Sequence, residues 1–473
     1  MPTSKLKSKL KSKPKSKYGL LGYGTVGQGV VRLLCRKEFG VWHDVKRDVK
    51  RDVKHDVDNV HDEMGSSIEP IKVYQLVEDV EFVFEATCGP HGLPWDACRL
   101  ALALGKTYIT ANKAMVSEHY MDILSCIEDG SKGRVYIEAC VCGGMPLVKV
   151  LQNHILRPQD DLLSFCGIVN GSTNWLLCEA QTRHTNSDQT NCDQTNSDQD
   201  LVTPIIQDMQ DLGYLEADPS FDLEGVDAAY KLCIIKNLSQ NLSPNVVCRA
   251  PCEASWGKCG LSSSLVDYTQ RTVPLVRGVS EVCRTDFDYA KAQGYVTIKL
   301  LAICTTQVTC VLPAFVSNAA VSNALATTSG SENTVVLTTA LLGTLTITAP
   351  GAGMYPTASA MMSDLAVADT NPQDRGSVQS RHSEFAHDRT STTDATEWEP
   401  RFIIRYPDSM ASDALKREGV WLQPWVYYLC SLSTLQNDIS ARCSATKNRP
   451  TENGSTKPTS GQSIDELMIF AVV

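Results

Sequence analysis

The sequence predicts an α/β protein that begins with a doubly wound parallel sheet, and three observations lead to this fold class. Short apolar segments at 18–21, 80–86 and 107–110 indicate buried strands. Between the last two, residues 95–104 have the pattern of a helix that ends at Gly105. A glycine-rich turn follows the first strand directly. Strands that alternate with helices favour a parallel sheet covered on both faces.

The composition indicates a soluble chain of more than one domain. Its 473 residues, 42% of them hydrophobic, are enough for two or three cores. No apolar run approaches the roughly 20 residues that a membrane span needs, so we expect no membrane partner. The net charge of −10 argues against a nucleic-acid partner for the chain as a whole. The 18 cysteines form no pair of CxxC motifs and follow no secretory signal, which favours reduced thiols and a cytoplasmic location.

Low-complexity stretches interrupt the pattern. Residues 1–17 carry a lysine at nearly every second position and predict a disordered tail, at most a modifier of binding to nucleic acid or an acidic membrane. Residues 43–62 repeat an Asp-Val-Lys unit. Residues 185–199 repeat a polar unit that cannot supply a core, so we expect a disordered insert there. The polar stretches 367–397 and 444–462 are expected to be linkers.

The turn after the first strand has the GxGxxG spacing of a Rossmann-type dinucleotide site. Gly22 permits the tight turn, Gly24 lets a pyrophosphate approach the backbone, and Gly27 lets helix and strand pack closely. Thr25 and Val26 lie at the start of the helix, whose free N–H groups suit phosphate. The motif alone is weak, but its position between strand and helix is the one that the mechanism requires. We therefore expect NAD or NADP as the cofactor.

The choice between the two nicotinamide cofactors is usually made at the end of the second strand. In this chain that region falls in the Asp-Val-Lys repeat, where Arg47 and Arg51 would suit the 2′-phosphate of NADP. A solvated charge run explains the same two residues equally well. The sequence thus favours NADP and leaves NAD open.

A carboxylate and a lysine downstream have the spacing of a helical pair. Asp227 and Lys231 are four residues apart, so on a helix they share a face. Reducing an aldehyde by hydride transfer creates an oxyanion that needs a proton, and a lysine can donate it if burial or a second cation lowers its pKa. Taken alone, the pair is more typical of an ordinary surface helix, where such pairs are common.

The order of these segments closely resembles that of the homoserine dehydrogenases. That family has a GxGTVG turn, a Thr-Ala-Asn-Lys strand end as at 110–113, and a Gly-Gly-x-Pro turn after a Glu, as at 138–146. It also has a long Gly-Tyr…Asp-Pro…Asp-x-x-Gly-x-Asp-x-x-x-Lys pattern, found here at 213–231. Residues 170–174 and 350–360 resemble two further family segments. The likeness covers most of residues 18–366, apart from the repeats and residues 241–276. Departures from the family pattern occur at Met209, Leu215, Cys140 and Cys142.

The resemblance implies a monofunctional homoserine dehydrogenase without a kinase domain. Such an enzyme reduces L-aspartate 4-semialdehyde to L-homoserine with NAD(P)H, reversibly, in threonine, methionine and isoleucine biosynthesis. It implies a nucleotide-binding domain at 18–146, to which 346–366 return, and a substrate-binding and dimerisation domain at 147–345. A small-molecule substrate and a homodimer are therefore expected.

The resemblance also assigns roles to individual residues. Lys231 is implied as the proton donor, with Asp227 orienting it and Lys113 facing the same pocket. The resemblance implies that Glu216 and Asp222 bind the polar amino-acid end of the substrate, near Gly171 and Ser172. The implied cofactor contacts are Gly22, Gly24, Thr25, Val26, Gly27, Arg47, Thr87, Asn112, Lys113 and Gly353.

A sodium or potassium ion is a further implication of the resemblance. Its ligands would be Glu138 and the carbonyl groups of Val141, Gly143 and Met145. Oxygen donors of this kind suit hard cations. A glutamate that only caps a turn explains Glu138 equally well.

The C-terminal residues 398–473 predict a separate small module. Residues 401–406, 420–422 and 467–472 are strand-like, and 413–419 have the pattern of a short helix. Some homoserine dehydrogenases end in a βαββαβ ligand-binding module of the ACT type, of which this segment could be a degraded copy. An unrelated extension that docks on the core is the alternative. Two other readings of the whole chain stay open: a catalytically silent paralogue that acts by binding, and a dehydrogenase of another oxo acid.

Overall fold

A computed structural model describes most of the chain in two compact units. The described residues are 16–34, 45–48, 70–189, 201–211, 215, 218–239, 275–305, 308–319, 323–370, 376–378, 401–407, 420–422, 425–431 and 468–472. The first unit comprises residues 1–161, 237–239 and 349–394, and the second comprises 162–236, 240–348 and 395–473. The expectations for Glu216, Arg51 and most of the repeats therefore fall outside the described residues.

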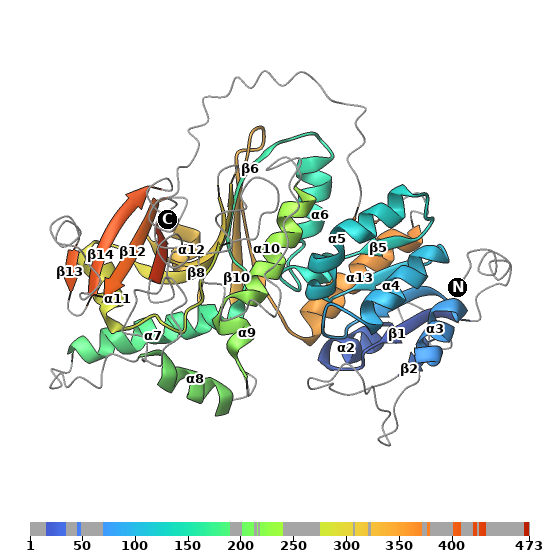
Figure 1. The fold of residues 1–473 in the computed structure, drawn as a ribbon, viewed down its shortest axis with the longest axis horizontal. Helices are drawn as coiled ribbons and strands as arrows, with labels where there is room; N and C mark the ends of the chain where they lie inside the picture. Colours follow the sequence, from blue (N-terminus) through green and yellow to red (C-terminus); the bar gives the residue numbers. More distant parts are fainter. Residues whose placement is uncertain are drawn as a thin grey trace, which may run out of the picture. The chain divides into compact units, whose positions relative to one another are not determined.

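The first unit is a parallel five-stranded sheet with helices on both faces (Figure 1). Its elements are β1 (Ser16–Leu21), α2 (Thr25–Leu34), β2 (Val45–Asp48), α3 (Pro70–Asp79), β3 (Val80–Glu85), α4 (Leu93–Ala103), β4 (Thr107–Thr110), α5 (Lys113–Glu128), β5 (Arg134–Tyr136), the 3-10 turn η3 (Glu138–Cys140), α6 (Leu147–Val150), the π-helical turn η4 (Leu151–Leu156) and α13 (Met354–Thr370). The strand order is β2-β1-β3-β4-β5. The order reverses between β1 and β3, and ligands of such sheets bind at the carboxyl ends of the strands at this point.

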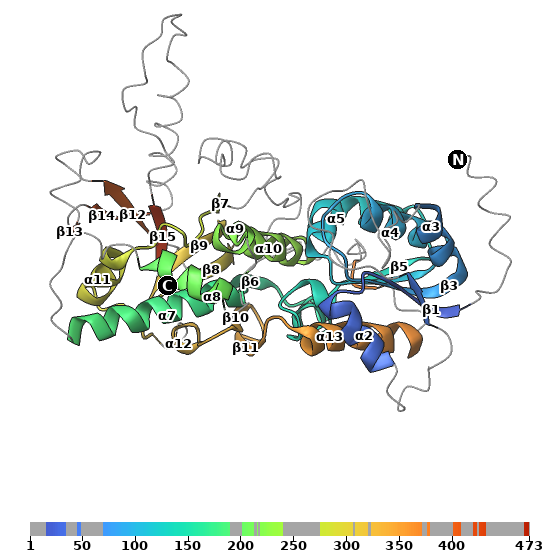
Figure 2. The ribbon, with the colours of Figure 1, turned by 90° about the horizontal axis from the view of Figure 1, so that it is seen from below.

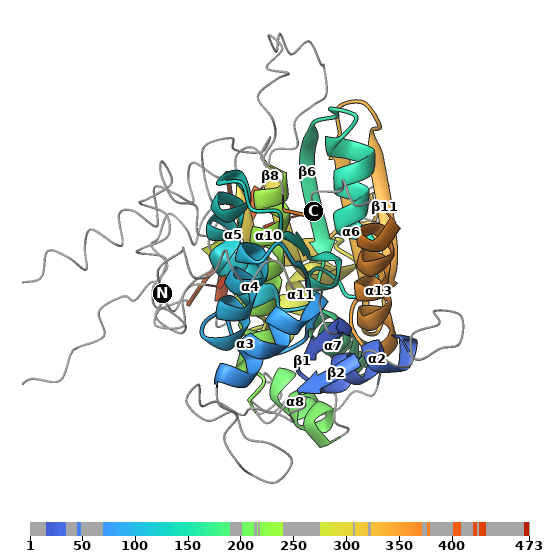
Figure 3. The same cartoon turned by 90° about the vertical axis from the view of Figure 1, so that its right-hand side faces the viewer.

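Helices cover the two faces of this sheet in different sets. Figures 2 and 3 show α2 and α13 side by side on one face, with α3, α4 and α5 on the other. The aromatic rings of Tyr18, Phe82 and Phe84 pack under α2 and α13 together with Met361. Helix α13, which lies near the end of the region that resembles the family, thus completes the first unit. This agrees with the predicted α/β fold class.

The second unit is built on a mixed sheet. Its elements are β6 (Leu162–Ile168), α7 (Gly171–Gln189), α8 (Val202–Asp211), α9 (Ser220–Leu223), α10 (Val226–Leu238), β7 (Leu275–Val276), α11 (Arg284–Ala292), β8 (Thr297–Thr305), β9 (Thr309–Val316), α12 (Asn323–Thr327), β10 (Glu332–Thr339), β11 (Thr344–Pro350), β12 (Arg401–Pro407), β13 (Val420–Leu422), β14 (Trp425–Ser431) and β15 (Met468–Val472). Strand β6 pairs antiparallel with β10 and β8, and β8 pairs antiparallel with β9. Every residue of β8 and β9 is buried, so these strands form the centre of the core.

The C-terminal strands extend this sheet. Strand β15 pairs in parallel with β9, and the order continues β15-β12-β14-β13 through antiparallel pairs. Within this order β14 lies between β12 and β13, and β12 lies between β15 and β14. A βαββαβ chain, which consists of two split βαβ units, has the same strand order. The connecting segments lie outside the described residues, so the ACT-type module stays a prediction.

Three expectations about segment boundaries need correction, and one strand was not predicted. The disordered tail was predicted through residue 17, but β1 begins at Ser16, where Lys17 forms an ion pair with Asp369 at 3.0 Å. The polar repeat was predicted as disordered from residue 185, but α7 continues to Gln189, because extending a formed helix costs much less than starting one. The linker predicted from 367 starts later, since α13 runs to Thr370, and strand β14 was not foreseen.

The predicted linker also contains an anchored segment. Ser377 and Val378 are buried, and Ser377 Oγ accepts a hydrogen bond from the backbone N–H of Ile137. Its polar composition gave no sign of this contact.

Among the described residues, no helix has the length and apolarity needed to cross a membrane.

Candidate active site

The glycine turn after β1 has the geometry that the motif predicts. Gly22 has φ +86°, and a Cβ there would lie 2.5 Å from the carbonyl oxygen of Ala86. A Cβ on Gly27 would lie 2.1 Å from the carbonyl oxygen of Gly22. Both contacts are too close for any side chain. Gly22 is therefore required by the close approach of the segment after β3, and Gly27 by the close approach of α2 to the turn.

Gly24 serves a different purpose, because a Cβ there would meet no heavy atom of the described chain within 4 Å. The first helical hydrogen bond of α2 runs from Gln28 N–H to the Gly24 carbonyl at 3.0 Å. The amide groups of Thr25, Val26 and Gly27 come before it and have no acceptor within the helix. The open space at Gly24, at the β1–β3 switch point and at the start of this helix, fits a dinucleotide pyrophosphate.

A buried carboxylate holds the neighbouring strand ends together. Glu85, the last residue of β3, accepts hydrogen bonds from Thr87 N–H at 2.7 Å, Thr87 Oγ1 at 2.5 Å and Thr110 Oγ1 at 2.6 Å. Burial raises the pKa of Glu85, and the hydrogen bonds from the threonines oppose that rise. The sequence interpretation missed Glu85, although a single acid at the carboxyl end of an apolar strand was a usable signal.

Asn112 and Lys113 begin α5 at the same edge. Asn112 Oδ1 accepts from Met115 N–H at 3.0 Å and so caps the helix, while Asn112 Nδ2 donates to the Gly89 carbonyl at 2.8 Å. Lys113 is the first residue of α5 and is half-buried. The predicted cofactor residues Thr87, Asn112 and Lys113 thus follow β3, which borders the switch point, and β4, which pairs with β3.

Two further predicted cofactor residues lie on other elements of the first unit. Arg47 is in β2, paired in register with Leu20 of β1, which places it near the carboxyl end of the second strand as expected. Its side chain is outside what the structure describes. Gly353 comes just before α13 and has φ +118°, a backbone conformation that favours glycine.

The second unit brings four polar side chains together. Lys231 Nζ donates to Asp227 Oδ2 at 2.7 Å and to the carbonyl oxygen of Val169 at 2.6 Å. Asn170 Nδ2 donates to Asp227 Oδ2 and to Asp222 Oδ1, both at 2.8 Å. Lys231 is 8% exposed and Asp227 4% exposed, so the pair is not an ordinary surface pair. Burial and hydrogen bonding of both charges favour the functional interpretation of the i, i+4 spacing.

Asn170 is the centre of this network, and the sequence interpretation did not assign it a role. Its Oδ1 accepts from Thr173 N–H at 2.9 Å, which caps the first turn of α7, while its Nδ2 joins Asp222 to Asp227. An asparagine before a Gly-Ser-Thr run is a recognisable N-cap signal. The bridge to two acids more than 50 residues away is not visible in the sequence.

The remaining predicted substrate residues lie around the start of α7. A Cβ on Gly171 would lie 2.5 Å from the carbonyl oxygen of Ser331, so packing within the second unit also requires this glycine. Ser172 is half-buried in the first turn of α7. Lys231 and Lys113 belong to different units, and their expected approach to one pocket stays a prediction.

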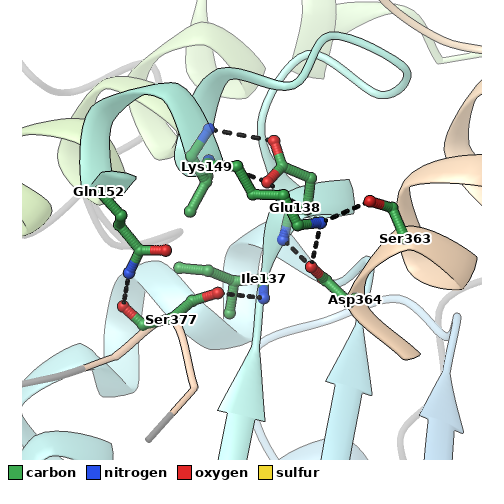
Figure 4. A network of polar contacts seen from close by, with 8 residues as sticks. Ile137, Glu138, Lys149, Gln152, Ser363, Asp364 and Ser377 are labelled. Atoms are coloured by element: carbon green, nitrogen blue, oxygen red, sulfur yellow. Dashed lines mark hydrogen bonds and ion pairs between the residues drawn. The ribbon is translucent and has the colours of Figure 1, made fainter. Parts of the chain in front are cut away.

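Glu138, the predicted cation ligand, lies in a buried polar network (Figure 4). Its carboxylate accepts from the backbone N–H groups of Val148 at 3.1 Å and Lys149 at 3.0 Å. Its own N–H donates to Asp364 Oδ2 at 3.0 Å, and Asp364 Oδ1 lies 2.7 Å from Lys149 Nζ. Burial raises the pKa of Glu138 to about 7, with Lys149 opposing this rise and Asp364 adding to it. The side chain therefore caps α6, and its expected role as a cation ligand stays a prediction.

The other predicted cation ligands form the loop after Glu138. Cys142 and Gly143 have φ values of +55° and +51°, which turn the loop sharply. A Cβ on Gly143 would lie 2.6 Å from the Gly351 carbonyl oxygen. The carbonyl of Met145 accepts from Leu147 N–H at 2.8 Å. No group of three or more His, Cys, Asp or Glu in the described part of the chain is arranged to hold a metal ion, and the predicted cation ligands are the Glu138 carboxylate and three backbone carbonyl groups, including that of Val141.

Comparison with known proteins places this site in a family. Residues 146–366 match the family model described as homoserine dehydrogenase. The homoserine dehydrogenase of Mycobacterium tuberculosis strain H37Rv is 32% identical over 382 residues, which cover 78% of this chain and 75% of that protein. The homoserine dehydrogenase of Helicobacter pylori is 29% identical over 360 residues, covering 73% and 72%.

Solved structures of the same name share the fold. The homoserine dehydrogenase of Thiobacillus denitrificans has a TM-score of 0.64 at 21% identity, with 98% of each chain covered. That of S. aureus has a TM-score of 0.59 at 19% identity, covering 98% of this chain and 100% of that one. The sequence relationship over three quarters of a relative's length, together with the ordered motifs, shows that this chain belongs to the homoserine dehydrogenase family.

Proposed function

We propose that this chain catalyses the reversible NAD(P)H-dependent reduction of L-aspartate 4-semialdehyde to L-homoserine, with Lys231 as the proton donor. One observation carries the assignment of Lys231. Its buried ammonium group is held by Asp227 Oδ2 at 2.7 Å and by the Val169 carbonyl at 2.6 Å. A lysine ammonium has three N–H donors. Within the described residues two of them are taken, which leaves one for a substrate oxygen.

The proposed chemistry divides between cofactor and protein. Bound at the glycine turn, the nicotinamide cofactor supplies a hydride to the aldehyde carbon. As negative charge develops on the aldehyde oxygen, Lys231 Nζ donates a proton to it. Asp227 fixes the direction of the ammonium group through the 2.7 Å hydrogen bond. In the reverse direction the neutral amine of Lys231 takes the hydroxyl proton of homoserine.

The amino-acid end of the substrate is proposed to bind beside this lysine. Asp222 is joined through Asn170 to the carboxylate that orients Lys231. A carboxylate in that position suits the substrate ammonium group. Glu216 is proposed as its partner in binding the substrate, and Gly171 and Ser172 as backbone contacts at the start of α7.

The cofactor is proposed to lie along the carboxyl edge of the first unit. Gly24 and the first amides of α2 would hold the pyrophosphate, and Thr87, Asn112 and Lys113 would contact the rest of the cofactor. Arg47 is proposed to favour NADP through the 2′-phosphate. A monovalent cation bound by Glu138 and the carbonyl oxygens of Val141, Gly143 and Met145 stays a proposal.

We also propose a cytoplasmic homodimer. The turn between β10 and β11 exposes two large apolar side chains, Leu341 at 76% and Leu342 at 54%, which a second copy would cover. Free buried thiols such as Cys98 and Cys140 suit a reducing compartment. Size-exclusion chromatography with light scattering tests the dimer directly: a monomer at micromolar concentration would contradict it.

The activity is tested by following NAD(P)H oxidation with L-aspartate 4-semialdehyde, with both cofactors. A turnover that is saturable in the semialdehyde and much faster than with a 2-oxo acid is the expected result. Faster turnover with another oxo acid would favour a different dehydrogenase. A folded chain that binds NADPH without turning over either substrate would favour the silent paralogue.

A further inference from the structure

Two histidines meet on the face of the first unit that carries α4 and α5. His91 lies in the loop between β3 and α4, and His119 lies within α5. His91 Nδ1 is 3.2 Å from His119 Nε2. Figure 2 shows α4 and α5 side by side on the same face of the sheet. The proposed reaction makes no use of either imidazole ring.

Each ring also turns its other nitrogen toward a carboxylate. His119 Nδ1 is 3.0 Å from Asp122 Oδ2, and His91 Nε2 is 3.7 Å from Glu118 Oε2. Histidines that bind metals commonly donate the second ring N–H to a carboxylate, which fixes the tautomer and leaves the other nitrogen with a lone pair. His119 has this arrangement on its Nδ1 side, and its Nε2, which shares a hydrogen bond with His91 Nδ1 here, is the nitrogen that a metal ion would take over.

The surroundings fix one ring and leave the other adjustable. The His119 ring stacks on Trp95 with ring centroids 4.1 Å apart and an interplanar angle of 3°. Its side chain is 13% exposed, and its backbone departs from helical values at φ −103° and ψ 17°. His91 has a side-chain exposure of 66%, so little packing holds its ring in one orientation and the ring can turn toward a shared ligand.

We propose that His91 and His119 form a binding site for a divalent transition-metal ion of the zinc, nickel and copper class. Two imidazole nitrogens at about 2.05 Å from a tetrahedral metal lie roughly 3.3 Å apart, close to the 3.2 Å separation found here. Imidazole ligands select these metals over magnesium and calcium, which prefer oxygen. The described residues supply no cluster of three His, Cys, Asp or Glu ligands, so the proposed site has two protein ligands and would need water for the remaining positions.

A bound metal would restrain a loop that also supports the edge of the sheet. The loop from β3 to α4 contains Gly89, whose carbonyl oxygen accepts from Asn112 Nδ2 at 2.8 Å. Linking His91 to His119 joins this loop to α5 a second time. Metal binding therefore holds together two segments that begin at the carboxyl ends of neighbouring strands.

The test is titration of the full-length chain with Ni²⁺ alone, followed by calorimetry and by tryptophan fluorescence. Paramagnetic Ni²⁺ held by His119 lies beside Trp95 and quenches its emission. The native chain is expected to bind one more equivalent than His91→Gln, and the quenching is expected to disappear in that variant. His91 is exposed, so its substitution leaves the fold intact. His154→Gln, at an exposed histidine of η4, is the matched control and should bind as the native chain does.

A second variant tests the role of the carboxylate. Asp122→Asn keeps both imidazole ligands and removes only the charge behind His119. Loss of such a carboxylate typically weakens metal binding by about 10- to 100-fold. Equal stoichiometry, affinity and quenching in the native chain, His91→Gln and His154→Gln would overturn the proposal. An unchanged affinity in Asp122→Asn would remove the carboxylate from it.

Discussion

Asn170 offers a sharp test of how the second unit organises its charged groups. Its amide nitrogen donates to Asp222 and Asp227, while its amide oxygen caps α7 through Thr173 N–H. Replacement by alanine removes both functions. Replacement by serine keeps a side-chain oxygen that can cap the helix but is too short to bridge the two carboxylates. Comparing the two variants separates the cap from the bridge.

The expected magnitudes follow from the contacts. Loss of an N-cap costs about 1 kcal/mol, and a hydrogen bond to a charged group is worth about 1.5–3 kcal/mol. Asn170→Ala should therefore lower the free energy of unfolding by roughly 1 kcal/mol more than Asn170→Ser. Both should lower kcat/KM alike, because Asp227 loses the 2.8 Å bond that holds it beside Lys231. A loss of 1.5–3 kcal/mol corresponds to roughly 10- to 150-fold.

Urea unfolding and steady-state reduction of aspartate 4-semialdehyde measure the two effects on the same samples. The bridge would be irrelevant to the reaction if Asn170→Ser kept kcat/KM within twofold of the native value. Equal unfolding free energies of the two variants would show that the cap contributes nothing.

Three further predictions concern the first unit. Gly24→Ala should weaken NADPH binding at least tenfold in a fluorescence titration, with little change in Tm. Gly27→Ala should instead lower Tm strongly, because its Cβ would lie 2.1 Å from the Gly22 carbonyl oxygen. Equal Tm values for the two variants would contradict this prediction. Glu85→Gln should destabilise the chain by about 1–3 kcal/mol and raise the KM for NADPH, because the new amide N–H would face the hydroxyl and N–H groups that now donate to the carboxylate. An unchanged KM would show that Glu85 does not contribute to cofactor binding. The pKa of Glu138 is about 7 in the folded chain, above its ordinary value of 4.5. The contribution of Glu138 to the free energy of unfolding should therefore fall by up to roughly 3 kcal/mol as the pH rises from 4.5 to about 7. Urea unfolding of Glu138→Gln should lack this fall, and parallel pH profiles would refute the shift.

Local patterns predicted much of the fold. Strand β4 has the expected bounds, and the glycine turn has the expected positive φ at Gly22 and close packing at Gly27. Both features depend on neighbouring residues or on a short βα unit, where sequence spacing determines geometry. The family-like order of motifs then gave the second domain, whose strands show no comparable periodicity.

What the sequence did not show depends on long-range contacts. Asn170 meets Asp222 and Asp227 only because α7, α9 and α10 converge, and nothing near Asn170 in the sequence signals this. Ser377 is buried against Ile137 although its surroundings are polar. The spacing of Asp227 and Lys231 taken alone favoured an ordinary surface helix, and only their burial separates the two interpretations.

The central claim is that Lys231 donates the proton, and substitution by methionine tests it most directly. Lys236 is a matched control, because it is a buried lysine of the same helix that donates to Thr309 Oγ1 and not to the charged network. With NADPH affinity measured separately, Lys231→Met should bind the cofactor normally and lose at least about 100-fold in kcat, while Lys236→Met should keep kcat within a few-fold. A Lys231→Met enzyme that reduces aspartate 4-semialdehyde at a near-native rate would contradict the account and direct attention to Lys113.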